Sequence, residues 1–173
     1  MGFLILVSGG IRSGKSAFAE RLMDERAGSS WTFWATGRAR DPEMEARIAS
    51  HRKRRAAGVE TVEDDFCAFV SSGIFGEGGP LSDTPLLLDN LGFCVMELLE
   101  LESSGSWVER FGRILSGRTG LTVIVTDEVG GGGIAMTPLG RSFADLTGEW
   151  NQQLARQASE VYTVMMGCPL RLK

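Results

Sequence analysis

The chain of 173 residues contains few cysteines, the residues that hold small secreted or metal-bound domains together. It contains three cysteines, Cys67, Cys94 and Cys168, which lie far apart and lack the spacing of metal ligands. An odd number of separated cysteines argues against a disulfide framework. It suits a protein of a reducing compartment, in which we expect these cysteines to be small core residues.

Long apolar runs and an excess of basic charge are also missing. No apolar run approaches the ~20 residues that a membrane-spanning helix requires, and Met1-Gly2-Phe3 has no basic region of a signal peptide. The formal net charge of −4 does not favour a nucleic-acid partner. We therefore expect a cytoplasmic protein with no membrane span and no nucleic-acid partner. Hydrophobic residues make up 43%, enough for a core, and residues 1–173 are predicted to form a single domain.

Short apolar runs alternate with amphipathic segments along the chain. Strands are predicted over residues 3–7, 31–35, 86–89, 121–126 and 161–166, with a further edge strand in 167–173. Helices are predicted over residues 16–26, 41–57, 61–72, 92–102, 107–115 and 137–154. Strands that alternate with helices predict an α/β three-layer sandwich with a mainly parallel central sheet.

A glycine-rich segment links the first strand to the first helix. It consists of Gly9, Gly10, Ile11, Arg12, Ser13, Gly14, Lys15 and Ser16. This is the P-loop pattern, in which backbone N–H groups wrap a phosphate chain, the lysine reaches the β- and γ-phosphates and the hydroxyl binds Mg²⁺. The sequence therefore predicts a P-loop NTPase fold, with ATP or GTP bound by these residues and Lys15 as a catalytic residue.

Two further candidates follow predicted strands. Asp89 ends the strand over 86–89, and a strand-end aspartate of this kind holds Mg²⁺ in P-loop proteins, directly or through water. Thr36 lies just past the strand over 31–35, where open α/β sheets place their ligands. We therefore predict Mg²⁺ as cofactor with Ser16 and Asp89 as its ligands, and Thr36 and Asp89 as nucleotide contacts.

The chain has one histidine, His51, on the basic helix predicted over 41–57. Arg47, His51, Arg54 and Arg55 share one face of that helix. A neutral imidazole can attack phosphorus and carry a nucleotidyl or phosphoryl group, and packed arginines would offset the charge of the phosphates. The alternative is a solvated basic face, which these residues alone favour because a charge run usually faces water.

Several stretches together resemble one family, the bifunctional adenosylcobinamide kinase and adenosylcobinamide-phosphate guanylyltransferase of cobalamin assembly. The matching residues are 7–16, 35–36, 41–55, 61, 63, 125–130, 139–143, 151–155 and 167–173. The P-loop is common to many families, but the combination with the Arg-Ile-x-x-His helix and the Glu-Val-Gly strand end is more specific. The resemblance covers nearly the whole chain.

The resemblance implies a RecA-like P-loop fold and two reactions. ATP or GTP would phosphorylate adenosylcobinamide, and GMP from GTP would then be transferred to adenosylcobinamide phosphate, giving adenosyl-GDP-cobinamide and pyrophosphate. It implies that a guanylylated histidine, at the position of His51, carries the GMP, and that Arg52, Arg55 and Glu63 contact nucleotide. It also implies a homotrimer whose nucleotide sites can be completed by a neighbouring subunit.

Two stretches depart from the family's pattern. Asp127 stands where the family commonly has asparagine, and residues 130–138 read Gly-Gly-Gly-Gly-Ile-Ala-Met-Thr-Pro. Because glycine has no side chain, we expect this loop to be flexible before a ligand binds. It could be a lid or a passive connection, and Glu128 before it could order Mg²⁺ or be a solvated acid. The four tryptophans are predicted to be core or interface anchors.

Other functions are compatible with a P-loop. A kinase in which His51 is silent, a RecA-like ATPase subunit that drives a partner, and a regulatory nucleotide-binding subunit all use the same phosphate cradle. The ATPase predicts hydrolysis stimulated by a macromolecule, and the regulatory subunit predicts binding without turnover. Covalent labelling of His51 by GTP would separate the guanylyltransferase from all three.

Overall fold

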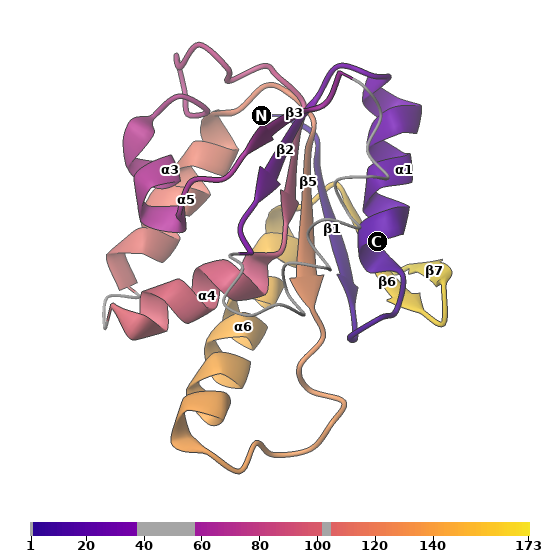
Figure 1. Cartoon of the computed structure of the whole chain (residues 1–173), viewed down its shortest axis with the longest axis vertical. Coiled ribbons are helices and arrows are strands. Elements are labelled where there is room, and N and C mark those ends of the chain that lie inside the picture. The colour runs from indigo at the N-terminus through magenta and orange to yellow at the C-terminus, as the bar shows by residue number, and fades with distance from the viewer. Residues whose placement is uncertain (1, 38–57, 102–104) are drawn as a thin grey trace.

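The computed structural model describes residues 2–37, 58–101 and 105–173, which form a seven-stranded sheet with helices on both faces (Figure 1). The strands are β1 (Leu4–Gly9), β2 (Thr32–Ala35), β3 (Glu60–Val62), β4 (Leu86–Asp89), β5 (Thr122–Asp127), β6 (Glu160–Met165) and β7 (Cys168–Arg171). The helices are α1 (Lys15–Ala27), α3 (Phe66–Ser72), α4 (Leu91–Glu100), α5 (Gly105–Gly117) and α6 (Pro138–Gln157). Among these residues no helix has the length and apolarity to cross a bilayer.

The strand order is β3-β2-β4-β5-β1-β6-β7. Neighbouring strands are parallel except β6 and β7, which form an antiparallel hairpin at one edge. The predicted parallel sheet and edge strand are confirmed. β1 lies between β5 and β6, and Gly9 at its end pairs with Asp127 on one side and Val164 on the other. The P-loop therefore starts in the middle of the carboxyl edge of the sheet.

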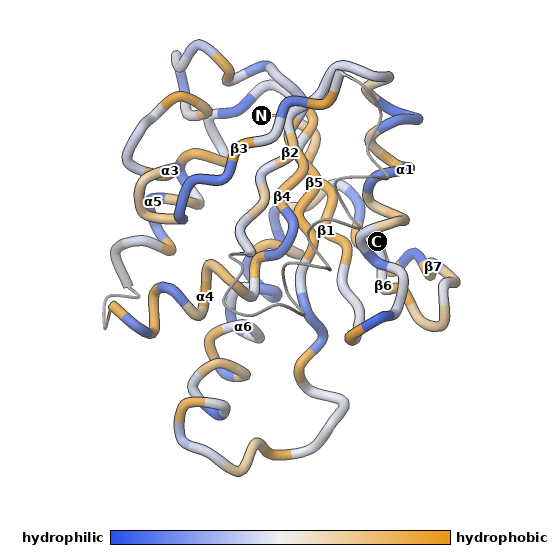
Figure 2. The backbone as a smooth tube through the Cα atoms, in the orientation of Figure 1, coloured by the Kyte–Doolittle hydropathy of each residue, from blue (hydrophilic) through white to orange (hydrophobic). Residues whose placement is uncertain are grey.

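The side chains of β1 point alternately to the two faces of the sheet and are apolar on both, which explains why helices cover both faces. Leu4 and Leu6 belong to the larger apolar cluster, to which α3, α4, α5 and α6 contribute. Ile5 and Val7 belong to the second cluster, on the side of α1. A strand buried on both faces has few polar positions, and Figure 2 shows the central strands as the most hydrophobic part of the tube.

One predicted helix starts later than expected, and another is not among the described residues. The predicted helix over 61–72 is wrong at its start, because Glu60–Val62 is the edge strand β3 and the helix α3 begins at Phe66. β3 is short and polar, and Thr61 adds to the sheet by pairing with Phe33 of β2. The helix predicted over 41–57 lies outside the described residues.

The four tryptophans pack in the core, as predicted. Trp31, Trp34 and Trp150 are buried, and Trp34 stacks on Phe69 with ring centroids 3.4 Å apart. Trp107 is half-buried against the same cluster.

The cysteines follow the core prediction only in part. Cys94 is fully buried in α4, whereas Cys168 is exposed on β7, which corrects the expectation for that residue. Burial, together with the charge of Glu97, raises the pKa of Cys67 to about 11.

Candidate nucleotide site

The P-loop turns sharply between β1 and α1. Arg12 and Gly14 both have left-handed backbones, with φ of 58° and 94°. Gly14 is the N-cap of α1, and no side chain caps the helix there. Left-handed turns and an uncapped helix start leave N–H groups for an anion. A non-glycine residue such as Arg12 in this conformation is typical of functional loops.

The P-loop packs closely against β6 and the turn between β6 and β7. A Cβ on Gly9 would lie 2.5 Å from Ser13 Oγ and 2.7 Å from the carbonyl oxygen of Val164. The turn of the β6–β7 hairpin supports the loop, since Gly167 N donates to the Ser13 carbonyl at 2.8 Å. Ser13 Oγ is buried and has no hydrogen-bond partner among the described residues. A phosphate oxygen at the loop would supply such a partner.

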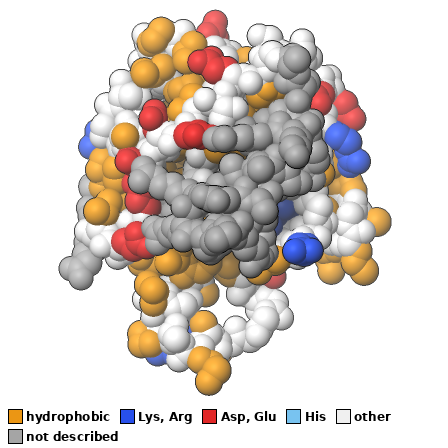
Figure 3. All heavy atoms as spheres, in the orientation of Figure 1, with side chains coloured by type: hydrophobic (Ala, Val, Ile, Leu, Met, Phe, Trp, Pro, Cys, Tyr) orange, Lys and Arg blue, Asp and Glu red, His pale blue; other side chains and the backbone are white. Residues whose placement is uncertain are grey.

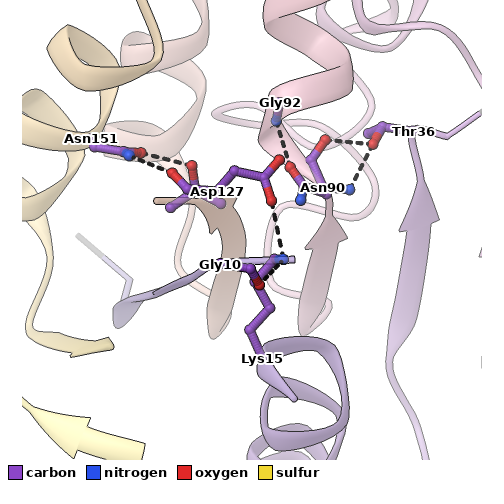
Figure 4. Close-up of polar contacts among 8 residues, drawn as sticks. Gly10, Lys15, Thr36, Asn90, Gly92, Asp127 and Asn151 are labelled. Carbon is purple, nitrogen blue, oxygen red and sulfur yellow. Dashed lines mark hydrogen bonds and ion pairs between the residues drawn. The ribbon is translucent and has the colours of Figure 1, made fainter. Parts of the chain in front are cut away.

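Lys15 is held by two oxygens at the mouth of the loop (Figure 4). Its Nζ lies 3.0 Å from Asp127 Oδ1 and donates to the Gly10 carbonyl at 3.2 Å. The side chains of Lys15 and Asp127 are 10% and 27% exposed. The acid that contacts the P-loop lysine is thus Asp127 at the end of β5. In the sequence, Asp127 stands out only as a departure from the family's pattern.

Hydrogen bonds hold the backbone around Asp127 in place. Asn151 of α6 donates from Nδ2 to the Asp127 carbonyl at 3.1 Å, and Asn151 Oδ1 accepts from Thr126 Oγ1 at 2.7 Å. Glu128 N donates to the Gly9 carbonyl at 3.1 Å, which continues the pairing of β5 with β1. The end of β5 is therefore tied both to α6 and to the P-loop strand.

The neighbouring strand ends are linked through Thr36. Its Oγ1 donates to the Asn90 carbonyl at 2.6 Å and accepts from Asn90 N at 2.7 Å. Asn90 in turn caps α4, because its Oδ1 accepts from Gly92 N at 2.5 Å. Thr36 therefore joins β2 to the turn after β4, a structural contact that the sequence did not suggest. Asp89 is half-buried at the end of β4.

The structure brings most of the predicted site to one edge. The P-loop residues 9–16, Thr36, Asp89 and Glu63 all lie at or just after the carboxyl ends of β1, β2, β3 and β4. Glu63 is exposed directly after β3. His51, Arg52 and Arg55 lie outside the described residues, so their predicted roles stay predictions.

The oxygen donors at this edge suit Mg²⁺. Asp127, Asp89 and the Ser16 hydroxyl are hard ligands of the type that Mg²⁺ prefers. Among residues 2–37, 58–101 and 105–173, no three His, Cys, Asp or Glu side chains converge as a metal site. Mg²⁺ in phosphoryl-transfer sites takes one or two carboxylates and completes its shell with water and phosphate. The donors present therefore fit a Mg²⁺ that arrives with nucleotide.

Glu128 has a local partner in its own loop. Its Oε1 accepts from Gly130 N at 2.7 Å and from Gly131 N at 3.0 Å. These bonds fold the start of the glycine-rich loop over the Glu128 carboxylate. A groove of about 680 Å³ lies beside this loop and is lined by residues of the loop, β1, the start of β6 and helix α6. Its lining includes Ser8, Glu128, Ile134, Arg141 and Asn151.

Comparison with known proteins identifies the family. The family described as cobinamide kinase / cobinamide phosphate guanyltransferase matches residues 5–172. The chain belongs to this family. A bifunctional adenosylcobalamin biosynthesis protein, CobP, from Pseudomonas aeruginosa is 33% identical over 171 residues, covering 97% of this chain and 96% of the relative. The protein CobU of the same description from Escherichia coli is 31% identical over 194 residues, covering 98% and 99%.

Membership of the cobinamide kinase / cobinamide phosphate guanyltransferase family makes this chain an enzyme with a nucleotide-binding P-loop. Among solved structures, a KaiC-like protein from Pyrococcus horikoshii is similar, with a TM-score of 0.49 and 18% identity. The similarity covers 94% of this chain and 70% of that one.

Proposed function

We propose that this chain phosphorylates adenosylcobinamide with ATP or GTP and then transfers GMP from GTP to adenosylcobinamide phosphate. The observation that carries the proposal is the P-loop, with Lys15 at its mouth, in a chain that matches the family over residues 5–172. The product is adenosyl-GDP-cobinamide, with pyrophosphate released in the second reaction.

In the kinase reaction the hydroxyl oxygen of cobinamide attacks the γ-phosphorus. The bond from that phosphorus to the β-bridging oxygen breaks, and the hydroxyl proton leaves to solvent or a base. Backbone N–H groups of residues 9–16 hold the phosphates, and the Lys15 ammonium faces the β- and γ-oxygens once it turns from Asp127. When bound, Mg²⁺ neutralises charge on the β- and γ-phosphates. Ser16, Asp89 and Asp127 would hold it, directly or through water.

In the guanylyltransferase reaction a neutral His51 nitrogen attacks the α-phosphorus of GTP. An N–P bond forms and pyrophosphate leaves; an oxygen of cobinamide phosphate then attacks the same phosphorus and frees the histidine. Arg52 and Arg55 would offset negative charge on the phosphates. Supporting this assignment are the family match, which spans residue 51, and the chain's single histidine.

Incubation of the purified protein with Mg²⁺ and GTP labelled at the α-phosphate tests the nucleophile. We expect acid-labile, base-stable label on the chain, and none on a His51→Ala variant, because a histidine phosphoramidate has this stability. A matched Arg52→Ala variant should still be labelled, at a lower rate. Label that persists on His51→Ala would contradict the assignment.

The kinase activity is tested separately. Adenosylcobinamide with ATP or GTP labelled at the γ-phosphate should yield labelled cobinamide phosphate, and His51→Ala should retain this activity. Phosphorylation without any covalent label would favour a kinase alone. Hydrolysis stimulated by a macromolecule and indifferent to cobinamide would favour the ATPase alternative, and binding without turnover the regulatory subunit.

The proposal includes a homotrimer. Large apolar side chains are exposed near the loop before α6, and Figure 3 shows hydrophobic side chains on the lower projection that this loop and α6 form. Ile134 is 87% and Met136 96% exposed, and Leu139 at the start of α6 is also exposed. Exposed apolar residues gathered in this way favour a protein interface. Light scattering coupled to gel filtration measures the subunit number, and a monomeric mass would contradict the proposed homotrimer.

A further inference from the structure

We propose that Asp127 makes the P-loop selective for metal-loaded nucleotide by occupying Lys15 when no nucleotide is bound. The inference rests on the proposed nucleotide site and adds a role for a residue at its centre. It concerns the form of triphosphate that this chain accepts. Metal-free nucleotide has to displace a carboxylate and then remain beside it.

Asp127 and Lys15 form an ion pair at the P-loop. Asp127 Oδ1 lies 3.0 Å from Lys15 Nζ, and Lys15 as a whole is 8% exposed. The ammonium is also bonded to the Gly10 carbonyl, within the loop that the phosphates would fill. A γ- or β-phosphate oxygen that binds Lys15 in the usual way therefore competes directly with Asp127.

The Asp127 carboxylate has little room to move away from this site. Its Oδ2 lies 2.6 Å from where a Cβ on Gly92 would be, so the carboxylate is pressed against the first turn of α4. Its backbone is held by Asn151 and follows the β1 pairing up to Gly9. Figure 4 shows the carboxylate between Lys15 and the turn that contains Asn90 and Gly92. Bound phosphates would thus share a partly buried site with this negative charge.

Electrostatic repulsion distinguishes metal-free from metal-loaded nucleotide at this carboxylate. A metal-free triphosphate carries about four negative charges near neutral pH, and like charges within a few ångströms in a partly buried site repel strongly. A Mg²⁺ bound with the phosphates would offset their charge, and Asp127 would then attract the complex, directly or through water. The same carboxylate therefore opposes metal-free nucleotide and favours the Mg²⁺ complex.

The test is calorimetric binding of a GTP analogue with a methylene group between the α- and β-phosphorus, with Mg²⁺ or with EDTA. This analogue cannot transfer GMP, so binding is measured without chemistry. Wild type should bind the metal-free analogue at least about tenfold more weakly than the Mg²⁺ complex. Asp127→Asn should tighten metal-free binding by about tenfold and remove most of this difference.

Asp83→Asn is the matched control, since it removes the same charge from an exposed position before β4, at the opposite edge of the sheet from the P-loop. It should leave metal-free binding within about threefold of wild type. No tightening in Asp127→Asn, or equal tightening in Asp83→Asn, would overturn the inference. Wild type that fails to bind even the Mg²⁺ complex would instead refute the nucleotide site itself.

A second measurement separates this role from damage to the loop. Thermal unfolding without nucleotide should occur at lower temperature in Asp127→Asn, because the Lys15 ammonium loses its counter-charge. Metal-free affinity is nevertheless expected to rise. A variant that merely distorted the P-loop would lose both stability and affinity, and that result would also overturn the inference.

Discussion

Lys15 and Arg118 are both buried cations, and they lie at opposite ends of the sheet. Lys15 lies at the carboxyl edge and faces one carboxylate and one carbonyl oxygen. Arg118 precedes β5 at the amino edge and is 1% exposed. Its guanidinium donates to neutral oxygens, namely Thr122 Oγ1 at 2.9 Å and the carbonyls of Phe75, Leu81 and Thr84.

The difference lies in what each partner can do. Backbone carbonyls of the segment 75–84 cannot be replaced by a ligand, so Arg118 fixes that segment to the start of β5. Burial lowers the pKa of Arg118 to about 10, against a raising effect of Asp83, and the group stays charged at neutral pH. Asp127 can bind a metal ion in place of Lys15, and the Lys15 ammonium is then available to bind phosphate. A buried cation is structural or functional according to whether its partners are replaceable.

The substitution Arg118→Met should have the largest effect and tests the structural role of this cation. We expect the free energy of unfolding in urea to fall by about 3 kcal/mol, since buried carbonyl oxygens lose their donor. Nucleotide affinity of the folded protein should not change. Arg113→Met, at an exposed site in α5, is the control and should alter stability by less than about 0.5 kcal/mol. A loss of affinity with little loss of stability would reverse the roles of the two cations.

Lys15→Met should give the opposite pattern. The dissociation constant of Mg²⁺-loaded GTP should rise about 10- to 100-fold, the value of a charge-assisted hydrogen bond. The free energy of unfolding without nucleotide should change by less than about 1 kcal/mol, because Asp127 is partly exposed and can be solvated. Calorimetry and urea unfolding on the same sample measure both. Unchanged affinity would place the phosphates elsewhere.

Gly92→Ala sharpens the comparison from the side of Asp127. The new Cβ would meet Asp127 Oδ2 at 2.6 Å and Asn90 Oδ1 at 3.1 Å, so one of these oxygens must shift. We expect a loss of about 1–2 kcal/mol in unfolding free energy. Gly112→Ala in α5 meets nothing within 4 Å and should stabilise by about 0.5–1 kcal/mol. The opposite signs in urea unfolding are the prediction, and equal effects would contradict it.

The smallest expected effect concerns Glu160, a buried acid at the amino end of β6. Burial acts to raise its pKa, but hydrogen bonds from Tyr162 and Arg26 outweigh it, so the pKa lies below the ordinary value of 4.5. The unfolded chain then binds more protons just below that value, and stability falls as the pH falls through this range.

Glu160→Gln should weaken the acid dependence of unfolding between about pH 7 and 3. It should also lower stability at neutral pH, where the charged form is bonded. Glu149→Gln, at an exposed position of α6, is the matched control. An acid dependence as steep in Glu160→Gln as in wild type would show that other carboxylates cause it.

The sequence predicted those parts of the molecule that depend on neighbouring residues. The P-loop, the buried strands and the helix that Thr137 and Pro138 open are local patterns, and all are confirmed. β3 was mistaken for helix because Glu60–Val62 has no apolar alternation and gains its structure from β2. Local pattern cannot reveal a strand whose stability comes from its partner.

The pairing of Lys15 with Asp127 depended instead on strand order. Asp89 and Asp127 both end strands, and only the order β4-β5-β1 decides that Asp127 is next to the P-loop. Arg118 was missed for a related reason, because its acceptors are backbone atoms that any sequence provides. The signal for Asp127 was the same as for Asp89, since each is an aspartate at the end of a buried strand.

The hairpin contact with the P-loop has a consequence for folding. The bond that supports the turn of residues 9–16 comes from Gly167, and β1 is flanked by β5 and β6. The phosphate cradle is therefore complete only after segments far apart in the sequence have packed together. A bound nucleotide would stabilise the assembled sheet and not the isolated strand and helix that flank the loop.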